Sequence, residues 1–476
     1  MTLYRPLTDA QVETIHEAAL TILETIGFTY EAGLDDVLAL LEDAGATVDR
    51  AAARVRLPRD LIAAQAERAP ERVVLYSRDG QRDLDLGEDR VHLGTGGAAV
   101  RILDLDTGKA RDTTLRDLYQ LGRLVDRLDN IDFFLRPCIP TDIPDEAYDV
   151  NVFYACLRGT TKHVMAGVND VEGLHRVREL AARVAGGEEQ LRQRPFISVI
   201  TSFAISPLKL CTPSTRIMRA AVQSGIPVAL SAAPMAGSTA PLTMAGTLVQ
   251  LHAEELMGVA ICQLTAPGAP ILYGGIPGMA DLHTMGYVGG GVECGMMNAA
   301  AHQLARRVRI PNYNSSGLSD AKIPDAQAGW EKGMTTLLVA LSGGNYIHHA
   351  AGMLESMLAV AYEQYVIDDE IIGMAKRVLR GIEVDPEHLA LEAVRAVGPG
   401  GNYMTSDHTM AHLRTEYYGG NGVTDRSGRA QWEGRGGMDA RERARSLARE
   451  ILAGQETPCI APDVDRSLRD RFEILL

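Results

Sequence analysis

The sequence is poor in several residue classes that would point to particular functions. Its six cysteines form no C-x-x-C pair, and a chain of this length needs no disulfide framework, so we expect a reducing, cytoplasmic setting. Acidic residues outnumber Lys and Arg by 62 to 47. This balance argues against nucleic acid as a partner, because binding to phosphates requires a basic surface. Aromatic residues make up only 5% of the chain.

No stretch of the sequence has the pattern of a targeting or membrane segment. Residues 1–30 lack a basic region followed by an apolar run, so we expect no signal peptide. The least charged stretch is 220–280, where Glu254 and Glu255 are the only charged residues. Glycine and proline interrupt this stretch repeatedly, which argues against a transmembrane helix. A soluble globular protein remains, long enough for two or three domains or one large barrel with extensions.

Short apolar runs alternate with helical patterns from about residue 90 onward. The runs lie at 91–94, 131–135, 163–167, 196–201, 227–231, 270–274, 310–314 and 345–350. Helical patterns follow at 114–128, 145–158, 170–184, 212–223, 243–265, 290–307, 325–341 and 353–375. Eight such units in about 285 residues are typical of a (β/α)8 barrel, although a doubly wound sheet would fit seven of them nearly as well.

Two extensions flank the predicted barrel of residues 91–375. Residues 1–90 contain a capping box at Thr8 and Gln11, three helical patterns and a hairpin signal at Asp79-Gly80. Residues 376–476 are rich in glycine and irregular, with helices expected near 406–416 and 438–453. The predicted fold is therefore an α/β TIM barrel with an N-terminal α+β extension and an irregular C-terminal wrap packed on the barrel.

We place the site at the carboxyl ends of the predicted strands, where barrel enzymes carry their functional residues. The residues at these ends are mostly small and neutral, with many glycines, which indicates an uncharged, funnel-shaped opening. Strand alternation points His348 inward, because Ile347 and His349 share the opposite face; a histidine hydrogen-bonded within the core is an equal alternative. The substrate-binding candidates are Gly96, Gly97, Arg136, Phe203, Tyr273, Tyr313 and His348. Aromatic faces such as these attract quaternary ammonium groups.

Asp320 and Glu254 are the candidate catalytic residues. Glu254 and its neighbour Glu255 lie in an otherwise uncharged stretch, where a carboxylate is costly unless it has a partner, so a structural ion pair is as reasonable as catalysis. Lys322 is an alternative as a Schiff-base lysine. Cys294 with a histidine is an alternative as a zinc site, although no spaced metal-binding signature is present, so we expect no metal.

Several long motifs resemble one known family. They are PMAGSTAPLTMAGTLVQ (234–250), AEEL (253–256), APGAPILYGG (266–275), SDAKIPDAQAGWE (319–331), EQYVIDDE (363–370) and HTMAH (408–412), followed by Arg426 and Trp432. Together they resemble the MttB-like trimethylamine:corrinoid methyltransferase family over nearly the whole chain. The resemblance implies a (β/α)8 barrel and transfer of a methyl group from a methylated amine to the cobalt of cobalamin (a corrinoid), carried by a separate protein.

The resemblance also bears on the substrate. The archaeal trimethylamine enzymes of this family carry pyrrolysine, whereas this sequence has only standard residues. It is therefore similar to the branch without pyrrolysine, whose members use quaternary amines, glycine betaine above all. Trimethylamine, proline betaine and carnitine are alternatives, as are a barrel lyase, a zinc enzyme and a non-catalytic betaine-binding protein. Donors for a betaine carboxylate are expected from the N–H groups of residues 94–97, His348 and Arg136, and a homo-oligomer is compatible with the sequence.

Overall fold

A closed barrel of eight parallel strands forms the centre of the computed structural model, which describes residues 4–456 and 459–476. In the order in which they pair, the strands are β6 (His92–Leu93), β20 (Tyr346–His348), β19 (Asn312–Ser315), β16 (Ile271–Gly275), β14 (Val228–Leu230), β11 (Ile197–Thr201), β10 (Val164–Ala166) and β9 (Phe134–Leu135). The N–H of Asp132 donates to the carbonyl of Leu93 at 2.7 Å and joins the last strand to the first. All eight predicted runs are strands, and the predicted barrel is confirmed.

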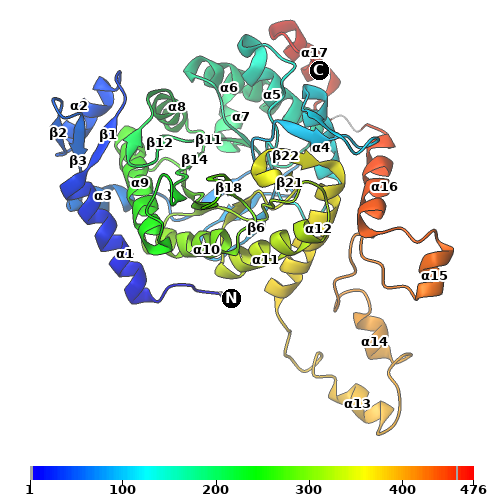
Figure 1. Ribbon diagram of the computed structural model, residues 1–476. Coiled ribbons are helices and arrows are strands. Elements are labelled where there is room, and N and C mark those ends of the chain that lie inside the picture. The colour runs from blue at the N-terminus through cyan, green and yellow to red at the C-terminus, as the bar shows by residue number, and fades with distance from the viewer. Residues whose placement is uncertain (1–3, 457–458) are drawn as a thin grey trace.

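The helices that follow the barrel strands surround this barrel (Figure 1). They are α4 (Leu115–Asp126), α5 (Asp145–Gly159), α6 (Val171–Ala185), α8 (Thr212–Gln223), α9 (Met244–Thr265), α10 (Val292–Arg307), α11 (Ala326–Ser342) and α12 (Tyr362–Arg380). Helix α9 packs on the barrel on one side and on α1 (Asp9–Thr21) and α3 (Arg59–Ala66) on the other. Because it is covered on both sides, it carries almost no charge, which explains the charge-poor stretch in the sequence.

The last predicted helix begins later than the sequence pattern indicates. Residues 353–361 form β21 (Met353–Leu354), a short turn and β22 (Ala359–Ala361), instead of the first turns of the helix predicted at 353–375. The turn residues Glu355, Ser356 and Met357 have φ values of 49°, 52° and 81°, which a right-handed helix cannot contain. Strand β22 pairs in parallel with β7 (Arg101–Leu103), a contact between distant parts of the chain that overrides the local helical pattern.

The N-terminal extension contains the predicted helices and a sheet that the sequence pattern did not indicate. Helices α1, α2 (Asp35–Asp43) and α3 are present, and Thr8 forms the expected capping box with Gln11. The sheet joins β1 (Phe28–Tyr30), β2 (Thr47–Asp49) and β3 (Arg54–Arg56) to β12 (Ala204–Ile205) and β13 (Lys209–Leu210), which lie in the loop after β11. The extension is thereby fixed to the carboxyl end of one barrel strand.

The predicted hairpin closes the amino-terminal end of the barrel, where the strands begin. Strands β4 (Val73–Leu75) and β5 (Leu84–Leu86) pair on either side of Asp79-Gly80. The N–H of Tyr76 donates to Pro195 and that of Arg78 to Thr161, both just before the start of a barrel strand. The apolar hairpin residues join the barrel interior in one cluster with Phe133, Leu135, Met165, Ala229, Leu272, Tyr313 and Tyr346. The amino-terminal end is therefore plugged, and the carboxyl end is left for a site.

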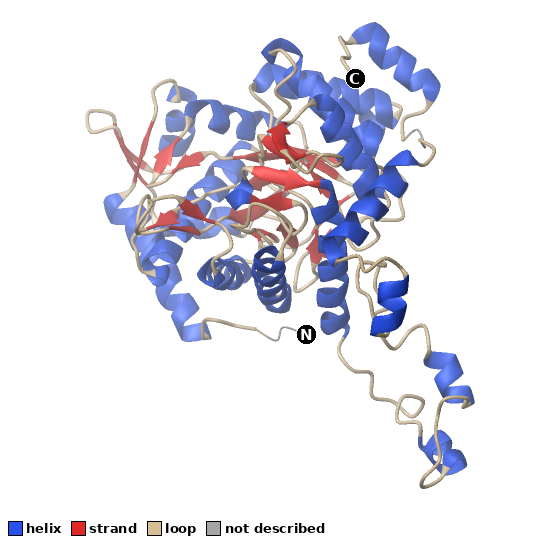
Figure 2. Ribbon diagram, turned by 45° about the vertical axis from the view of Figure 1, so that its right-hand side comes forward, coloured by secondary structure: helices blue, strands red, loops and turns tan. Residues whose placement is uncertain are grey.

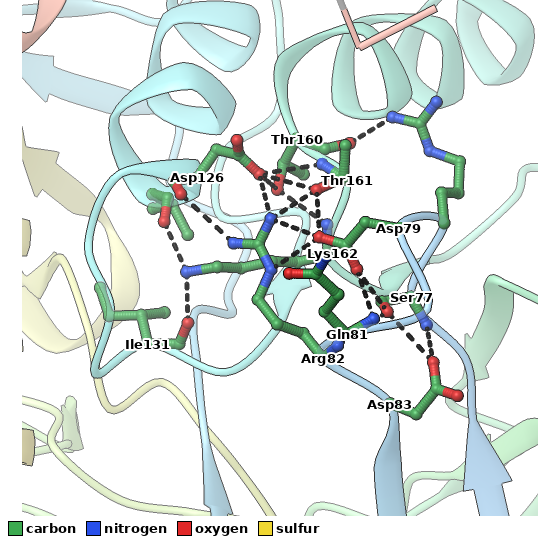
Figure 3. A network of polar contacts seen from close by, with 12 residues as sticks. Ser77, Asp79, Gln81, Arg82, Asp83, Asp126, Ile131, Thr160, Thr161 and Lys162 are labelled. Carbon is green, nitrogen blue, oxygen red and sulfur yellow. Dashed lines mark hydrogen bonds and ion pairs between the residues drawn. The ribbon is translucent and has the colours of Figure 1, made fainter.

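A polar network attaches this hairpin to the barrel (Figure 3). Arg82 pairs with Asp79 at 2.8 Å and with Asp126, at the end of α4, at 3.3 Å. Next to this network the buried ammonium of Lys162 donates to the carbonyls of Val125 and Leu128, at 2.6 and 2.7 Å, and to that of Ile131. Lys162 thus satisfies carbonyls at the end of α4 and in the turn that leads to β9.

The C-terminal residues are irregular, and only part of them packs on the barrel as the expected wrap. Helix α16 (Ala440–Ala453) packs on α12 and α4, and α17 (Pro462–Arg471) packs on α6. Helices α13 (Leu391–Val397), α14 (Asp407–His412) and α15 (Arg429–Gly434) instead extend away from the barrel (Figure 2). Within the described residues, no helix has the length and apolar character needed to cross a bilayer.

Replacement of Lys162 tests the role of its buried ammonium. We expect Lys162→Met to lower the free energy of unfolding by about 2–4 kcal/mol, because the carbonyls after α4 lose their donor while the side-chain volume is kept. The exposed Lys109 in the turn between β7 and β8 (Ala110–Asp112) gives the matched control, Lys109→Met. Urea unfolding followed by circular dichroism measures both, and equal midpoints for the two variants would contradict this role.

Candidate active site

Three aromatic rings and a histidine lie together inside the barrel. The ring of Tyr346 on β20 stacks on Phe133 with 3.6 Å between centroids and an angle of 15°. Tyr313 on the neighbouring strand β19 lies 5.8 Å from Tyr346, and the edge of His348 meets Tyr313 at 3.9 Å. Phe133, Tyr313 and Tyr346 belong to the interior cluster. His348 therefore points inward at the carboxyl end of β20, the end that the hairpin leaves open.

The polar atoms of this group are buried and have no partners. Both ring nitrogens of His348 and the hydroxyl of Tyr346 lack a hydrogen bond within the described residues. The alternative of a histidine satisfied within the core therefore does not hold. Burial, together with the neighbouring His349, places the pKa of His348 well below its usual value. The imidazole is neutral, with one N–H donor and one acceptor nitrogen for a ligand. Three unpartnered atoms in one place are unusual for a folded core.

Arg136 and the glycine turn after β6 lie at the same end of the barrel. Arg136 follows β9, and its Nη1 lies 3.4 Å from the hydroxyl of Tyr148 on α5. It forms no ion pair with any described carboxylate, and its positive charge lowers the pKa of Tyr313 against the larger effect of burial. A Cβ atom at Gly96 would lie 3.1 Å from Cβ of His348, and one at Gly97, where φ is 126°, would lie 2.5 Å from Sδ of Met353. Glycine is required there for the turn to approach β20.

A buried ion pair behind β19 and β20 supports this group. Nζ of Lys332 on α11 lies 3.1 Å from Oδ2 of Asp368 on α12, and neither side chain is exposed. Lys332 also donates to the carbonyls of Gly317 and Met353, and Asp368 accepts from the N–H of Gly352 at 2.7 Å. Burial lowers the pKa of Lys332 and raises that of Asp368, while each charge opposes the shift of the other. The pair fixes the loops after both strands.

The sequence reasoning missed this pair because 35 residues separate its members. The available signal was a lysine on the helical stretch 326–342, where Glu331 is the one other charged residue, and an aspartate on the buried side of the next helix. His349 connects the pair to the site: its Nδ1 lies 2.8 Å from Oγ of Ser315, its ring lies 3.9 Å from that of His348, and the charge of Lys332 contributes to its low pKa, about 3.

Phe203 and Tyr273 lie outside the barrel, which corrects their expected position at its mouth. A Cβ atom at Gly258 of α9 would lie 2.5 Å from the ring of Phe203, so this ring packs on the helix. The hydroxyl of Tyr273 lies 2.8 Å from Nδ1 of His252, also on α9. On β16 the interior position belongs to Leu272, and alternation therefore turns Tyr273 outward.

The candidate catalytic carboxylates, Glu254 and Asp320, accept hydrogen bonds from loop residues. Glu254 accepts from Oγ of Ser206 at 2.8 Å and from the N–H of Leu208 at 2.9 Å, and Asp320 accepts from the N–H of Gly289 at 2.9 Å. Glu255 accepts from the N–H of Gly274 at 2.9 Å, at the end of β16. Neither glutamate forms an ion pair within the described residues. Burial raises the pKa of both glutamates.

Lys322 and Cys294 lack the surroundings that their alternative roles require. Lys322 is exposed, and its Nζ donates to the carbonyl of Asp320 at 2.7 Å, whereas a Schiff-base lysine needs an apolar pocket. Burial raises the pKa of Cys294 to about 12, and its thiol donates to the carbonyl of Val288 at 3.2 Å. The described part of the chain contains no group of three or more His, Cys, Asp or Glu residues placed to hold a metal ion.

Comparison with known proteins agrees with the resemblance seen in the motifs. Residues 1–473 match the family model described as trimethylamine methyltransferase (MTTB). The chain is 35% identical over 466 residues to the trimethylamine methyltransferase MttB of Desulfitobacterium hafniense, with 98% of this chain and 93% of that protein covered. It is 32% identical over 468 residues to a glycine betaine methyltransferase of the same species, with 98% and 96% covered.

A solved structure shows the same fold. The monomethylamine methyltransferase of Methanosarcina barkeri superposes with a TM-score of 0.52 and 13% identity, over 93% of this chain and 92% of that one. At this identity the likeness concerns the fold alone. The family model, by contrast, spans nearly the whole chain. This chain therefore belongs to the trimethylamine methyltransferase (MTTB) family of methyltransferases.

Proposed function

We propose that this protein transfers a methyl group from a small quaternary amine, with glycine betaine favoured, to the Co(I) of a corrinoid carried by a separate protein. The observation that carries the proposal is the uncharged aromatic group inside the barrel, with a neutral His348 at the carboxyl end of β20 whose two nitrogens are unpartnered. The similarity to relatives named for trimethylamine and for glycine betaine supports the class of substrate.

The interior suits a quaternary ammonium ion. Aromatic faces attract such a cation without a hydrogen bond, which it could not donate, and Phe133, Tyr313 and Tyr346 place three rings inside the barrel. In the reaction the electron pair of Co(I) forms the new bond to carbon, the C–N bond breaks, and its pair stays on nitrogen. The amine leaves neutral, so no general base is needed. The protein contributes orientation of one methyl group and exclusion of water.

The polar groups around the rings favour a substrate with a carboxylate. The neutral His348 offers one N–H, and no described acceptor takes the N–H of Gly96 or Gly97. Arg136, which has no carboxylate partner, adds positive charge at the same end. Glycine betaine would use these donors and trimethylamine would not. The sequence also contains only standard residues, without the pyrrolysine of the archaeal trimethylamine enzymes. Trimethylamine is the second candidate, because of the relative that bears its name.

The loops at the open end suit a protein partner that carries the methyl acceptor. Large apolar side chains are exposed on the loops that follow four barrel strands: Leu242, Leu282, Met285, Ile323 and Leu358. Exposed apolar residues around a functional opening are typical of a docking surface. We propose that the corrinoid protein docks there and brings its cobalt to the opening. The acceptor is thus a second substrate.

An anaerobic spectroscopic assay tests the reaction and the substrate together. The purified protein is mixed with Co(I) cobalamin or with a Co(I) corrinoid protein, and glycine betaine is added. We expect the spectrum of methyl-Co(III) to appear with release of one dimethylglycine per cobalt. Reaction with trimethylamine but not with glycine betaine would correct the substrate. A lack of reaction with every methylated amine, with the corrinoid protein present, would contradict the proposed function.

Replacement of His348 tests recognition of the carboxylate. We expect His348→Phe to weaken glycine betaine binding about 10- to 100-fold, the effect of losing one hydrogen bond to a charged group. Binding of tetramethylammonium, which has no carboxylate, should stay within about twofold because the aromatic rings remain. Calorimetry measures both ligands, with His175→Phe on the exposed side of α6 as the matched control. Equal losses for the two ligands would contradict a contact between His348 and the carboxylate.

A further inference from the structure

His349 has an unusual backbone conformation at the carboxyl end of β20. Its φ of 63° lies in the left-handed region, which few residues other than glycine adopt, although histidine is found there more often than most. In a regular strand, alternation would turn His349 outward with Ile347, away from His348. The left-handed backbone breaks this alternation, and the ring centroids of His348 and His349 lie 3.9 Å apart. The two imidazoles are therefore neighbours.

The contact with Ser315 shows that His349 faces the barrel interior. Ser315 lies two residues after Tyr313 on β19, so their side chains share one face of the strand, and Tyr313 belongs to the interior cluster. Asn314 between them faces the other way, because its side-chain amide donates to a carbonyl of α10 at 2.8 Å. Nδ1 of His349 lies 2.8 Å from Oγ of Ser315. His349 is therefore on the side of the candidate site, where strand alternation did not place it.

The glycine turn after β6 lies against the ring of His349. A Cβ atom at Gly96 would lie 3.1 Å from Cδ2 of His349 and 3.0 Å from its backbone nitrogen. Because Cδ2 is bonded to Nε2, this second ring nitrogen lies near the turn. Neither Nε2 nor the N–H of Gly96 has a hydrogen-bond partner within the described residues. His349 also keeps 3% of its surface accessible, whereas His348 has none. Nε2 and the N–H of Gly96 are thus open to a ligand.

The hydrogen bond to Ser315 decides which ring nitrogen of His349 carries the proton. Burial, with a contribution from the charge of Lys332, lowers the pKa of His349 to about 3, so the ring is neutral and has one N–H. Ser315 is buried, and its Oγ has no other partner in the described part of the chain. If Nδ1 donated to Oγ, the serine hydrogen would lack an acceptor, which is costly in a core. The serine hydroxyl therefore donates to Nδ1, and the ring proton lies on Nε2.

We propose that His349 is a second carboxylate-binding residue of the site and that Ser315 positions it by holding its proton on Nε2. The inference rests on the proposed function, because the carboxylate is that of a betaine substrate. His348 and His349 each offer one N–H, so that each oxygen of the carboxylate can accept its own hydrogen bond, and bonds to a charged acceptor are the stronger ones. The methyl groups of the substrate take no part in these contacts and remain free for transfer.

The buried ammonium of Lys332 favours an anionic group at this position. It donates to the carbonyl of Gly317, in the loop that follows Ser315, and its charge acts on His349. The same charge stabilises a carboxylate bound at Nε2. It also opposes protonation of His349, which would repel the quaternary ammonium of the same substrate. Asp368 balances the charge of Lys332 within the folded protein.

Replacement of His349 by asparagine isolates the Nε2 donor. Asparagine tolerates the left-handed backbone, and its amide oxygen can replace Nδ1 as the acceptor for Ser315, but the side chain is too short to replace Nε2. We expect His349→Asn to weaken glycine betaine binding about 10- to 100-fold, the effect of one hydrogen bond to a charged group. Tetramethylammonium binding should stay within about twofold, because this cation has no carboxylate.

Calorimetry measures both ligands, and the chain offers a matched control. His163 forms the same kind of buried contact, with its Nε2 2.8 Å from Oγ of Ser198, at the amino-terminal end of the barrel. His163→Gln should bind both ligands as the wild type does. Circular dichroism shows whether each variant is folded.

A double-mutant cycle tests the positioning role of Ser315. We expect Ser315→Ala to weaken glycine betaine binding about three- to tenfold, because the proton of His349 can then move to Nδ1. Ser315→Thr keeps the hydroxyl and should restore binding. In the His349→Asn background, Ser315→Ala should have no further effect, because Ser315 acts through Nε2 of His349. Nitrogen-15 NMR of the ligand-free protein should show Nδ1 of His349 without a proton, in the signal that His349→Asn removes.

Three outcomes would overturn the inference and leave the proposed function standing. One is a His349→Asn variant that binds glycine betaine as tightly as the wild type, or that loses both ligands equally. Another is a proton on Nδ1 of His349 in the wild type. The third is full additivity of Ser315→Ala and His349→Asn, which would give Ser315 a role of its own. A wild-type protein that binds neither ligand would contradict the proposed function, and this inference with it.

Discussion

The ion pair between Lys332 and Asp368 is the contact on which the candidate site depends. Two charges without exposed surface cost several kcal/mol each to remove from water, and they persist only where their mutual attraction and further hydrogen bonds compensate. Here those hydrogen bonds go to Gly317, Gly352 and Met353, in the loops after β19 and β20. These loops follow the strands that carry Tyr313, Tyr346 and His348. Lys332 contacts both loops, and Asp368 contacts the loop after β20 and compensates the charge of Lys332.

The two ends of the barrel have different physical character, and this difference decides where chemistry is possible. The hairpin of β4 and β5 fills the amino-terminal end with leucine side chains, and the contacts of Arg82 hold it there. The carboxyl end instead contains His348, whose two ring nitrogens have no partner within the described residues and whose ring lies next to that of Tyr313. Unsatisfied polar atoms in a core are costly, so their concentration at this end is best explained by a ligand that completes their hydrogen bonds.

Exposed apolar surface is concentrated in two places, the loops around the barrel opening and residues 382–417. Around the barrel opening it consists of single residues on separate loops, which suits a partner that binds and leaves. Over residues 382–417 it is dense, and no residue of 382–422 is buried.

The sequence alone determined the elements whose signals are local. The eight apolar runs, most of the barrel helices and the hairpin at Asp79-Gly80 follow from periodicity and turn chemistry within a few residues, and the long motifs identified the family.

Only the tertiary structure decided which aromatic side chains enter the barrel, because in strands of two to five residues a shift of one position turns a side chain from inside to outside. Tyr313 and His348 therefore face inward as expected, whereas Tyr273 faces α9. The pairing of Lys332 with Asp368, and of β1 with β13, joins residues far apart in the chain. Such contacts depend on the packing of whole elements and leave no periodic signal in the sequence.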